Sequence, residues 1–103
     1  MAIDLTPEML EEYAQGSAPV VIKFFADWCG PCKMFAPIFE KAAAKVEGKA
    51  VFAQVDIDAQ PALAEKFEIM NVPAIVLIKN GETVKKHSGI MNENQLLKLV
   101  EEA

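Results

Sequence analysis

A continuous apolar run, PVVIKFFA at residues 19–26, is the feature that most narrows the folds open to this chain. The run has no helical period, and only Lys23 interrupts it. Apolar residues at nearly every position are typical of a strand buried on both faces. Such strands belong to mainly parallel sheets that helices cover on both sides. The run therefore predicts an inner strand of an α/β domain.

Helical patterns precede and follow this strand. A short helix is predicted to begin at Pro7, with Thr6 as its N-cap, and to stop at Gly16. A longer helix is predicted from residue 31 to about residue 46, and Pro37 is expected to bend it. A short strand at residues 2–4 could come before both helices.

The second half of the chain continues the alternation of strands and helices. Residues 50–58 read as a second inner strand and residues 61–67 as a short helix. Residues 74–89 have the form of a β-hairpin around Asn80-Gly81, and a last helix from Asn92 should bury Leu96, Leu97 and Val100. This order predicts a central mixed β-sheet flanked by helices on both faces.

Length and charge limit the possible functions. A chain of 103 residues predicts a single domain, residues 1–103, and we expect a monomer. The net charge of −5, with no long basic run, argues against nucleic acid as a partner. No apolar run approaches a membrane span, and the acidic Asp4 and Glu8 do not fit a secretory signal. We therefore expect a cytoplasmic protein that does not bind membranes.

The two cysteines, Cys29 and Cys32, lie in the segment DWCGPCK, directly after the buried strand and at the start of the predicted helix. Backbone N–H groups and the helix dipole stabilise a thiolate at that place. Cys32 lies one turn further in, close enough to form a disulfide with Cys29. These positions predict that Cys29 attacks and Cys32 resolves. Pro31 stiffens the loop between them, and Gly30 lets a partner's backbone approach.

Two other interpretations of the cysteine pair are open. A closed metal site needs four ligands, and the chain adds only His87, far away in the predicted hairpin, so no metal is expected unless two chains share one. The cysteines could also be buried thiols without a function. A CxxC motif at a strand-to-helix junction favours redox chemistry over both.

A family resemblance extends these arguments. The segments FFADWCGPCKMFAPIFEKAA, DID at residues 56–58, NVPAIVLIKNGE and HSGIMNENQL resemble thioredoxin in order and spacing over nearly the whole chain. WCGPCK is the family's active-site signature. The resemblance implies the thioredoxin fold and a protein-disulfide reductase with no bound cofactor. It also implies client proteins with disulfides as partners, and thioredoxin reductase, expected to be NADPH-linked, as the electron source.

Four further site residues are implied by the resemblance. Trp28 matches the tryptophan beside the attacking cysteine, where a flat ring supports a docked substrate, although it could instead only pack against the loop. Pro73 matches a cis-proline that faces the disulfide and frees the backbone of Val72 to pair with an extended substrate. Gly89 matches a glycine that leaves room at the edge of the substrate groove, although it could simply be a turn glycine.

The sequence departs from the family at two paired positions. Lys23 stands where most thioredoxins have a buried aspartate, and Gln54 stands where they have its lysine partner. The aspartate is usually described as the proton acceptor for the resolving cysteine. A desolvated lysine could serve as a neutral base, or it could stay charged, favour the dithiol and make the protein more oxidising. Its stem could also carry the charge to water or to Asp56, with no role in catalysis.

Two other functions compete with a protein-disulfide reductase. The same scaffold could be a binding module, such as a polymerase or chaperone accessory, with idle cysteines. It could also be a more oxidising thiol oxidase or isomerase. The intact WCGPCK segment argues against the first, and the lack of an export signal argues against the second.

Overall fold

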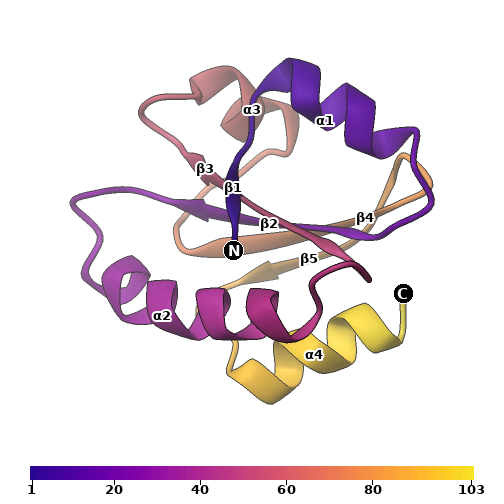
Figure 1. Ribbon diagram of the computed structural model, residues 1–103. Helices are drawn as coiled ribbons and strands as arrows, with labels where there is room; N and C mark the ends of the chain where they lie inside the picture. Colours follow the sequence, from indigo (N-terminus) through magenta and orange to yellow (C-terminus); the bar gives the residue numbers. More distant parts are fainter.

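The computed structural model describes residues 1–103 and is built around a five-stranded mixed sheet with the order β1-β3-β2-β4-β5 (Figure 1). The strands are β1 (Ile3–Asp4), β2 (Val20–Phe25), β3 (Val51–Asp56), β4 (Ala74–Lys79) and β5 (Glu82–Ser88). Strands β1, β3 and β2 are parallel, whereas β4 and β5 run antiparallel to their neighbours. The central mixed sheet, the short first strand and the hairpin are confirmed.

Four helices cover the sheet on both faces. They are α1 (Pro7–Ala14), α2 (Gly30–Lys45), α3 (Pro61–Lys66) and α4 (Glu93–Glu101). Helices α1 and α3 lie on one side of the sheet, and α2 and α4 lie on the other (Figure 1). The predicted flanking of the sheet by helices on both faces is confirmed.

Local sequence signals explain where the helices begin. The Thr6 hydroxyl accepts a hydrogen bond from the Met9 N–H at 3.2 Å, which satisfies one of the free donors of α1. Asn92 and Gln95 form a reciprocal capping box at the start of α4. Helix α2 runs through Pro37 without a break.

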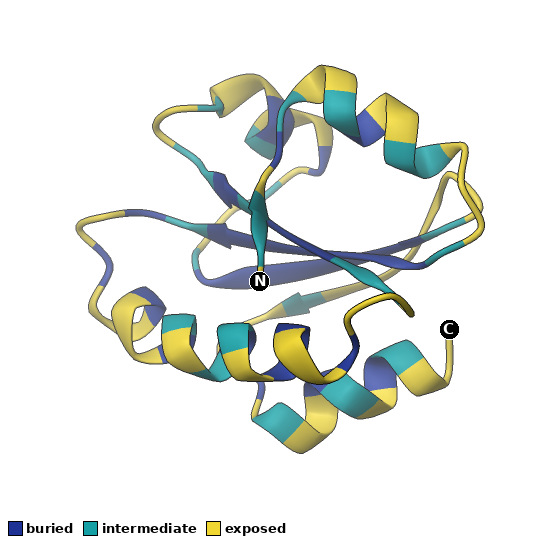
Figure 2. Ribbon diagram, viewed as in Figure 1, coloured by how far each residue is buried: buried dark blue, intermediate teal, exposed yellow.

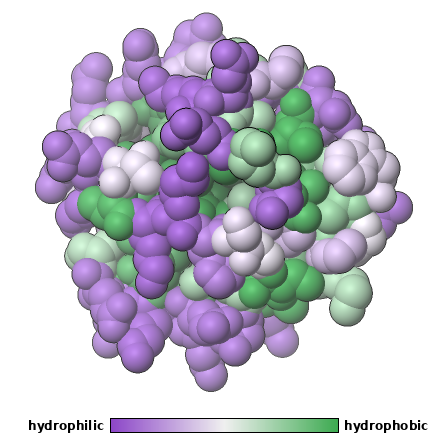
Figure 3. Space-filling model, turned by 180° about the vertical axis from the view of Figure 1, so that it is seen from behind, coloured by the Kyte–Doolittle hydropathy of each residue, from purple (hydrophilic) through white to green (hydrophobic).

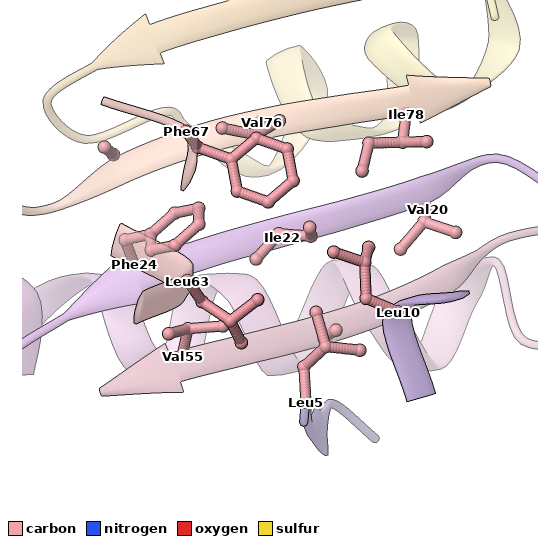
Figure 4. Packing of buried hydrophobic residues seen from close by; sticks show 12 residues of the cluster. Leu5, Leu10, Val20, Ile22, Phe24, Val55, Leu63, Phe67, Val76 and Ile78 are labelled. Atoms are coloured by element: carbon pink, nitrogen blue, oxygen red, sulfur yellow. The ribbon is translucent and has the colours of Figure 1, made fainter. Parts of the chain in front are cut away.

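Successive residues of β2 point to opposite faces and so serve two cores. Val20, Ile22 and Phe24 pack beneath α1 and α3, in the cluster drawn in Figure 4. Val21 packs on the other face, with the aromatic and aliphatic side chains of α2 and α4. Figure 2 shows β2 and β4 as mostly buried ribbons between helices that are exposed on their outer sides. This double burial is the reason for the continuous apolar run in the sequence.

The apolar stripe of α4 differs from the predicted one. Leu96 and Leu99 are its buried residues, and Leu97 and Val100 are only partly buried. The prediction of Leu96, Leu97 and Val100 therefore omitted Leu99. A spacing of three residues keeps Leu96 and Leu99 on one face of the helix, whereas neighbours such as Leu96 and Leu97 diverge.

The strand register determines where the ends of β2 and β4 meet. Phe24 pairs with Ala74 across the antiparallel ladder, so Pro73, just before β4, lies beside Phe25 at the end of β2. The loop that carries the two cysteines leaves β2 at this same end. Segments more than 40 residues apart in sequence are thereby brought together.

Candidate active site

Cys29 is the N-cap of α2, and its sulfur occupies the place of a capping oxygen. Its Sγ accepts a hydrogen bond from the Cys32 N–H at 3.2 Å. The two cysteines form a disulfide, with their Cα atoms 5.3 Å apart. A sulfur in this position receives the field of the helix N-terminus, which stabilises it as a thiolate when the disulfide is reduced.

Burial hardly distinguishes the two sulfurs. Cys29 is 5% exposed and Cys32 is 3% exposed, so both are buried in the oxidised protein. Cys32, one turn further into α2, is the slightly more buried of the two. The assignment of Cys29 as the attacking thiol therefore depends on its capping position and stays a prediction.

The segment before β4 faces the disulfide. The carbonyl oxygen of Val72 lies 3.7 Å from Cys29 Sγ, and the Val72–Pro73 peptide bond is cis, as the resemblance implied. The Gly89 N–H donates to the Pro73 carbonyl at 2.8 Å. Gly89 has a φ of +98°, and a Cβ added there would point into open space. The structure thus brings three of the predicted substrate-binding residues together.

Trp28 lies on the surface beside the disulfide. It is 68% exposed, and its Nε1–H donates to Asp58 Oδ2 at 3.0 Å. The hydrogen bond fixes the ring while leaving it accessible, so the interpretation that Trp28 only packs against its loop does not fit its exposure. Asp58 was not predicted as a site residue. The tertiary contact is visible only once β3 lies beside β2.

Lys23 is the only buried charged residue, with 3% of its surface exposed. Its Nζ lies 5.2 Å from the centroid of the Phe25 ring and 5.1 Å from that of Phe39. Lys23 forms no ion pair, since the single salt bridge of the structure joins Lys45 and Glu93. Lys23 therefore does not pair with Asp56, and its Nζ meets solvent only within the cleft that it lines.

The charge of Lys23 is influenced in two opposite ways. Burial lowers the pKa of its ammonium, and the negative charge of Glu40 raises it to a smaller extent. Glu40 also accepts a hydrogen bond from the Ala2 N–H at 3.0 Å, which ties it to the start of the chain. The two aromatic faces favour the ammonium through cation–π attraction. Neither Glu40 nor Phe39 carried a role in the sequence prediction.

A cleft of about 260 Å³ connects Lys23 with the resolving cysteine. Lys23, Gln54 and Cys32 line it, with Asp27 and Lys33 at its rim. Gln54 pairs with Lys23 in the strand register, but its side-chain amide donates to Asp4 Oδ1 at 2.8 Å. Gln54 is therefore held by β1 and does not replace the missing carboxylate.

No three His, Cys, Asp or Glu side chains are grouped as metal ligands. His87 lies in β5, paired with Ile75. None of the helices combines the length and the apolar character that crossing a bilayer requires.

Exposed apolar side chains occur in the segments that carry or face the disulfide. Six large hydrophobic residues are exposed in the chain, and four of them lie within two residues along the chain of a cysteine, of Val72 or of Gly89: Trp28, Met34, Met70 and Ile90. Met70 is the most exposed of all, at 91%. Figure 3 shows apolar groups concentrated toward the right of the view, the end that carries the β2–α2 loop. We call these four residues the docking surface, because exposed apolar patches are typical of protein contacts.

Comparisons with known proteins agree with the geometry. The sequence model of the family Thioredoxin matches residues 2–102. The chain is 46% identical over 90 residues to a mitochondrial thioredoxin of Mus musculus, covering 87% of this chain and 54% of that protein. It is 36% identical over 99 residues to a thioredoxin of Staphylococcus haemolyticus, covering 96% of this chain and 94% of that protein.

The two relatives differ in length. This chain spans about half of the mitochondrial protein and nearly all of the bacterial one. The match covers both cysteines, the cis-proline segment and all elements of the sheet. The chain therefore belongs to the thioredoxin family.

Proposed function

We propose that this chain reduces disulfide bonds in client proteins through the Cys29–Cys32 pair. The observation that carries the proposal is the disulfide at the N-terminus of α2, in a chain of the thioredoxin family. We take residues 1–103 as one thioredoxin domain that works as a monomer.

The proposed reaction has two exchange steps. The Cys29 thiolate attacks one sulfur of the client disulfide, that bond breaks, and the other client sulfur leaves as a thiolate. The Cys32 thiolate then attacks Cys29 Sγ, and the mixed disulfide breaks with release of the second client thiolate. Two electrons pass to the client, and the chain is left with its own disulfide.

The oxidised chain must then be reduced again. We propose a thioredoxin reductase that passes two electrons from NADPH to the Cys29–Cys32 disulfide. We place this cycle in the cytoplasm, because a reducing compartment keeps such a pair in the dithiol form. No metal or prosthetic group takes part in the proposed steps.

Client docking is proposed on the docking surface and on the segment before β4. An extended client segment would pair with the backbone of Val72, and Gly89 would leave space for it at the groove edge. The ring of Trp28, held by Asp58, would support the client beside the reacting sulfur. Gly30 and Pro31, the first two residues of α2, would shape the surface that the client sulfur approaches.

The proposal is tested by electron transfer to a protein disulfide. The oxidised chain is mixed with NADPH, a thioredoxin reductase and insulin, and NADPH consumption is followed. We expect consumption that depends on the chain and on insulin, with insulin thiols appearing in step. A contrary result has two parts: no NADPH is consumed, and the chemically reduced chain leaves insulin intact. A chain that behaves in this way but still binds client proteins would be a binding module with idle cysteines.

Met70→Ser should weaken client docking without slowing the exchange chemistry. Met70 is 91% exposed and adjoins the segment that faces Cys29, so its apolar surface is free for a client to cover. Losing part of that burial, about 1 kcal/mol, should raise KM for insulin roughly fivefold and leave kcat unchanged. The matched control is Val84→Ser, which removes an exposed apolar side chain from β5, away from the disulfide. Equal KM values for the two variants would contradict a docking role for Met70.

A further inference from the structure

The cleft beside Cys32 contains a buried positive charge that no carboxylate neutralises directly. Lys23 lies in β2, is 3% exposed, and forms no ion pair, and its Nζ keeps contact with solvent only in the cleft that it lines. Its Nζ contacts the faces of Phe25 and Phe39 instead. An ammonium with so little contact with water is costly, because burial disfavours the charged form. Its placement therefore calls for a role in the cleft.

The charged groups around the cleft come from every element packed against Lys23. Helix α2 contributes Cys32, Glu40 and the exposed Lys33. The β2–α2 loop contributes Asp27, which is exposed to solvent. Strand β3 contributes the neutral Gln54, and β4 contributes the apolar Ile75 in register with Lys23. Glu40 is held by the Ala2 N–H, and Asp27 and Lys33 are exposed, so Lys23 is the charged residue of the cleft lining that is least exposed to water.

We propose that the Lys23 ammonium stabilises the thiolate of Cys32 across this cleft and so speeds the release of the client. The inference deepens the proposed function and depends on it for the client-release step. Lys23 acts through Cys32 and touches no client, so it is a positioning residue. Its positive charge increases the thiolate fraction of Cys32 by stabilising the thiolate. A nearby proton acceptor would have the same effect by taking the proton of the thiol.

The step assisted is the second exchange. The Cys32 thiol gives its proton to water in the cleft, which is large enough to hold water. The thiolate attacks Cys29 Sγ, the bond between Cys29 and the client breaks, and the electron pair leaves with the client sulfur, which is then protonated. The nearby ammonium increases the fraction of Cys32 that is thiolate at neutral pH, and the rate rises with that fraction.

The charge state of Lys23 also determines how the free energy of unfolding depends on pH. Because burial lowers the pKa of Lys23 below 10.5, the unfolded chain binds more protons than the folded chain between the folded pKa and 10.5. Around neutral pH, the free energy of unfolding of the oxidised wild type should therefore be lower than that of Lys23→Met by an amount that does not change with pH. This deficit should shrink as the pH rises toward 10.5. A deficit that is already shrinking below pH 7 would mean a neutral lysine and would overturn the proposal.

The decisive experiment titrates Cys32 alone. In Cys29→Ser, Cys32 is the only cysteine, and its thiolate is followed by ultraviolet absorbance. We expect Lys23→Met in this background to move the midpoint of the titration upward by about one pH unit, a tenfold loss of thiolate at neutral pH. Lys23→Arg keeps the charge, so its titration midpoint should stay close to that of the Cys29→Ser chain with Lys23. Lys33→Met removes a charge from the exposed rim of the same cleft and should move the midpoint much less.

The same variants in the two-cysteine chain test the consequence for the reaction. Release of a thiol from its mixed disulfide with Cys29 should be about threefold slower in Lys23→Met at neutral pH. The slowing is less than the tenfold loss of thiolate, because a thiol with a higher pKa gives a more nucleophilic thiolate. An unchanged midpoint in Lys23→Met, or an equal shift in Lys33→Met, overturns the inference even if the wild type reduces insulin. A wild type that leaves insulin intact while the midpoint shifts as expected refutes the proposed function and leaves the charge coupling in place.

Discussion

Cys32→Ser should accumulate as a mixed disulfide with client proteins, whereas Cys29→Ser should form none and should lose all reduction of insulin. In Cys32→Ser, Cys29 keeps its capping position at the N-terminus of α2 and can still attack. The second exchange is absent, because a serine hydroxyl does not displace a disulfide. In Cys29→Ser, the remaining thiol is buried behind the first turn of the helix, with 3% of its surface exposed.

The measurement is capture of a disulfide-containing client on each immobilised variant, followed by release with a reductant. The double serine variant is the control for contacts that involve no sulfur. Covalent capture by Cys29→Ser as strong as that by Cys32→Ser would reverse or remove the assignment of roles. The burial of the two sulfurs differs too little to make this assignment by itself, so the experiment tests the capping position directly.

Phe39→Ala should lower the free energy of unfolding by about 3–5 kcal/mol, a large share of the total for a domain of this size. Phe39 is fully buried in α2, and its ring centroid lies 5.8 Å from that of Phe35 and 4.7 Å from that of Phe52. Its removal leaves a cavity between the helix and the sheet. Denaturant unfolding of the oxidised chain measures the loss.

Phe24→Ala is the matched control for Phe39→Ala. Phe24 is also fully buried, but it lies on the other face of the sheet and contacts Phe67. We expect a similar loss of stability. Of these two phenylalanines, only Phe39 has its ring against Lys23, so Lys23→Met should be non-additive with Phe39→Ala and additive with Phe24→Ala. Additivity in both pairs would show that the ring does not stabilise the ammonium.

Most of the fold could be predicted from the chain because its local signals agree with its global arrangement. The apolar run of β2 required cover on both faces, and α1, α2 and α4 provide part of that cover with apolar stripes of their own. Thr6 and Asn92 marked helix starts that the structure confirms. Leu99 was missed because adjacent leucines in a short helix leave the direction of the stripe open until the sheet is in place.

The site was predictable only where it is continuous in sequence. The position of Cys29 and Cys32 between a buried strand and a helix indicated thiol chemistry, and the family resemblance supplied Pro73 and Gly89. Contacts between distant segments were out of reach. The bond from Trp28 to Asp58 and the approach of Val72 to Cys29 depend on the parallel pairing of β2 with β3 and the antiparallel pairing of β2 with β4.

Lys23 shows most clearly where the sequence stopped being sufficient. From the chain alone, a lysine in an apolar strand could have reached water, since its stem is long enough to carry the charge out of a core. Whether the charge of Lys23 reaches open water depends on the groups that lie over the lysine. Helix α2 places the ring of Phe39 and the carboxylate of Glu40 near it. By itself the sequence determined the layers, the helix starts and the redox pair, because periodicity and capping are local. Only the tertiary structure decided the surroundings of the buried charge, because burial and electrostatic field are sums over neighbours that the chain brings together from distant positions.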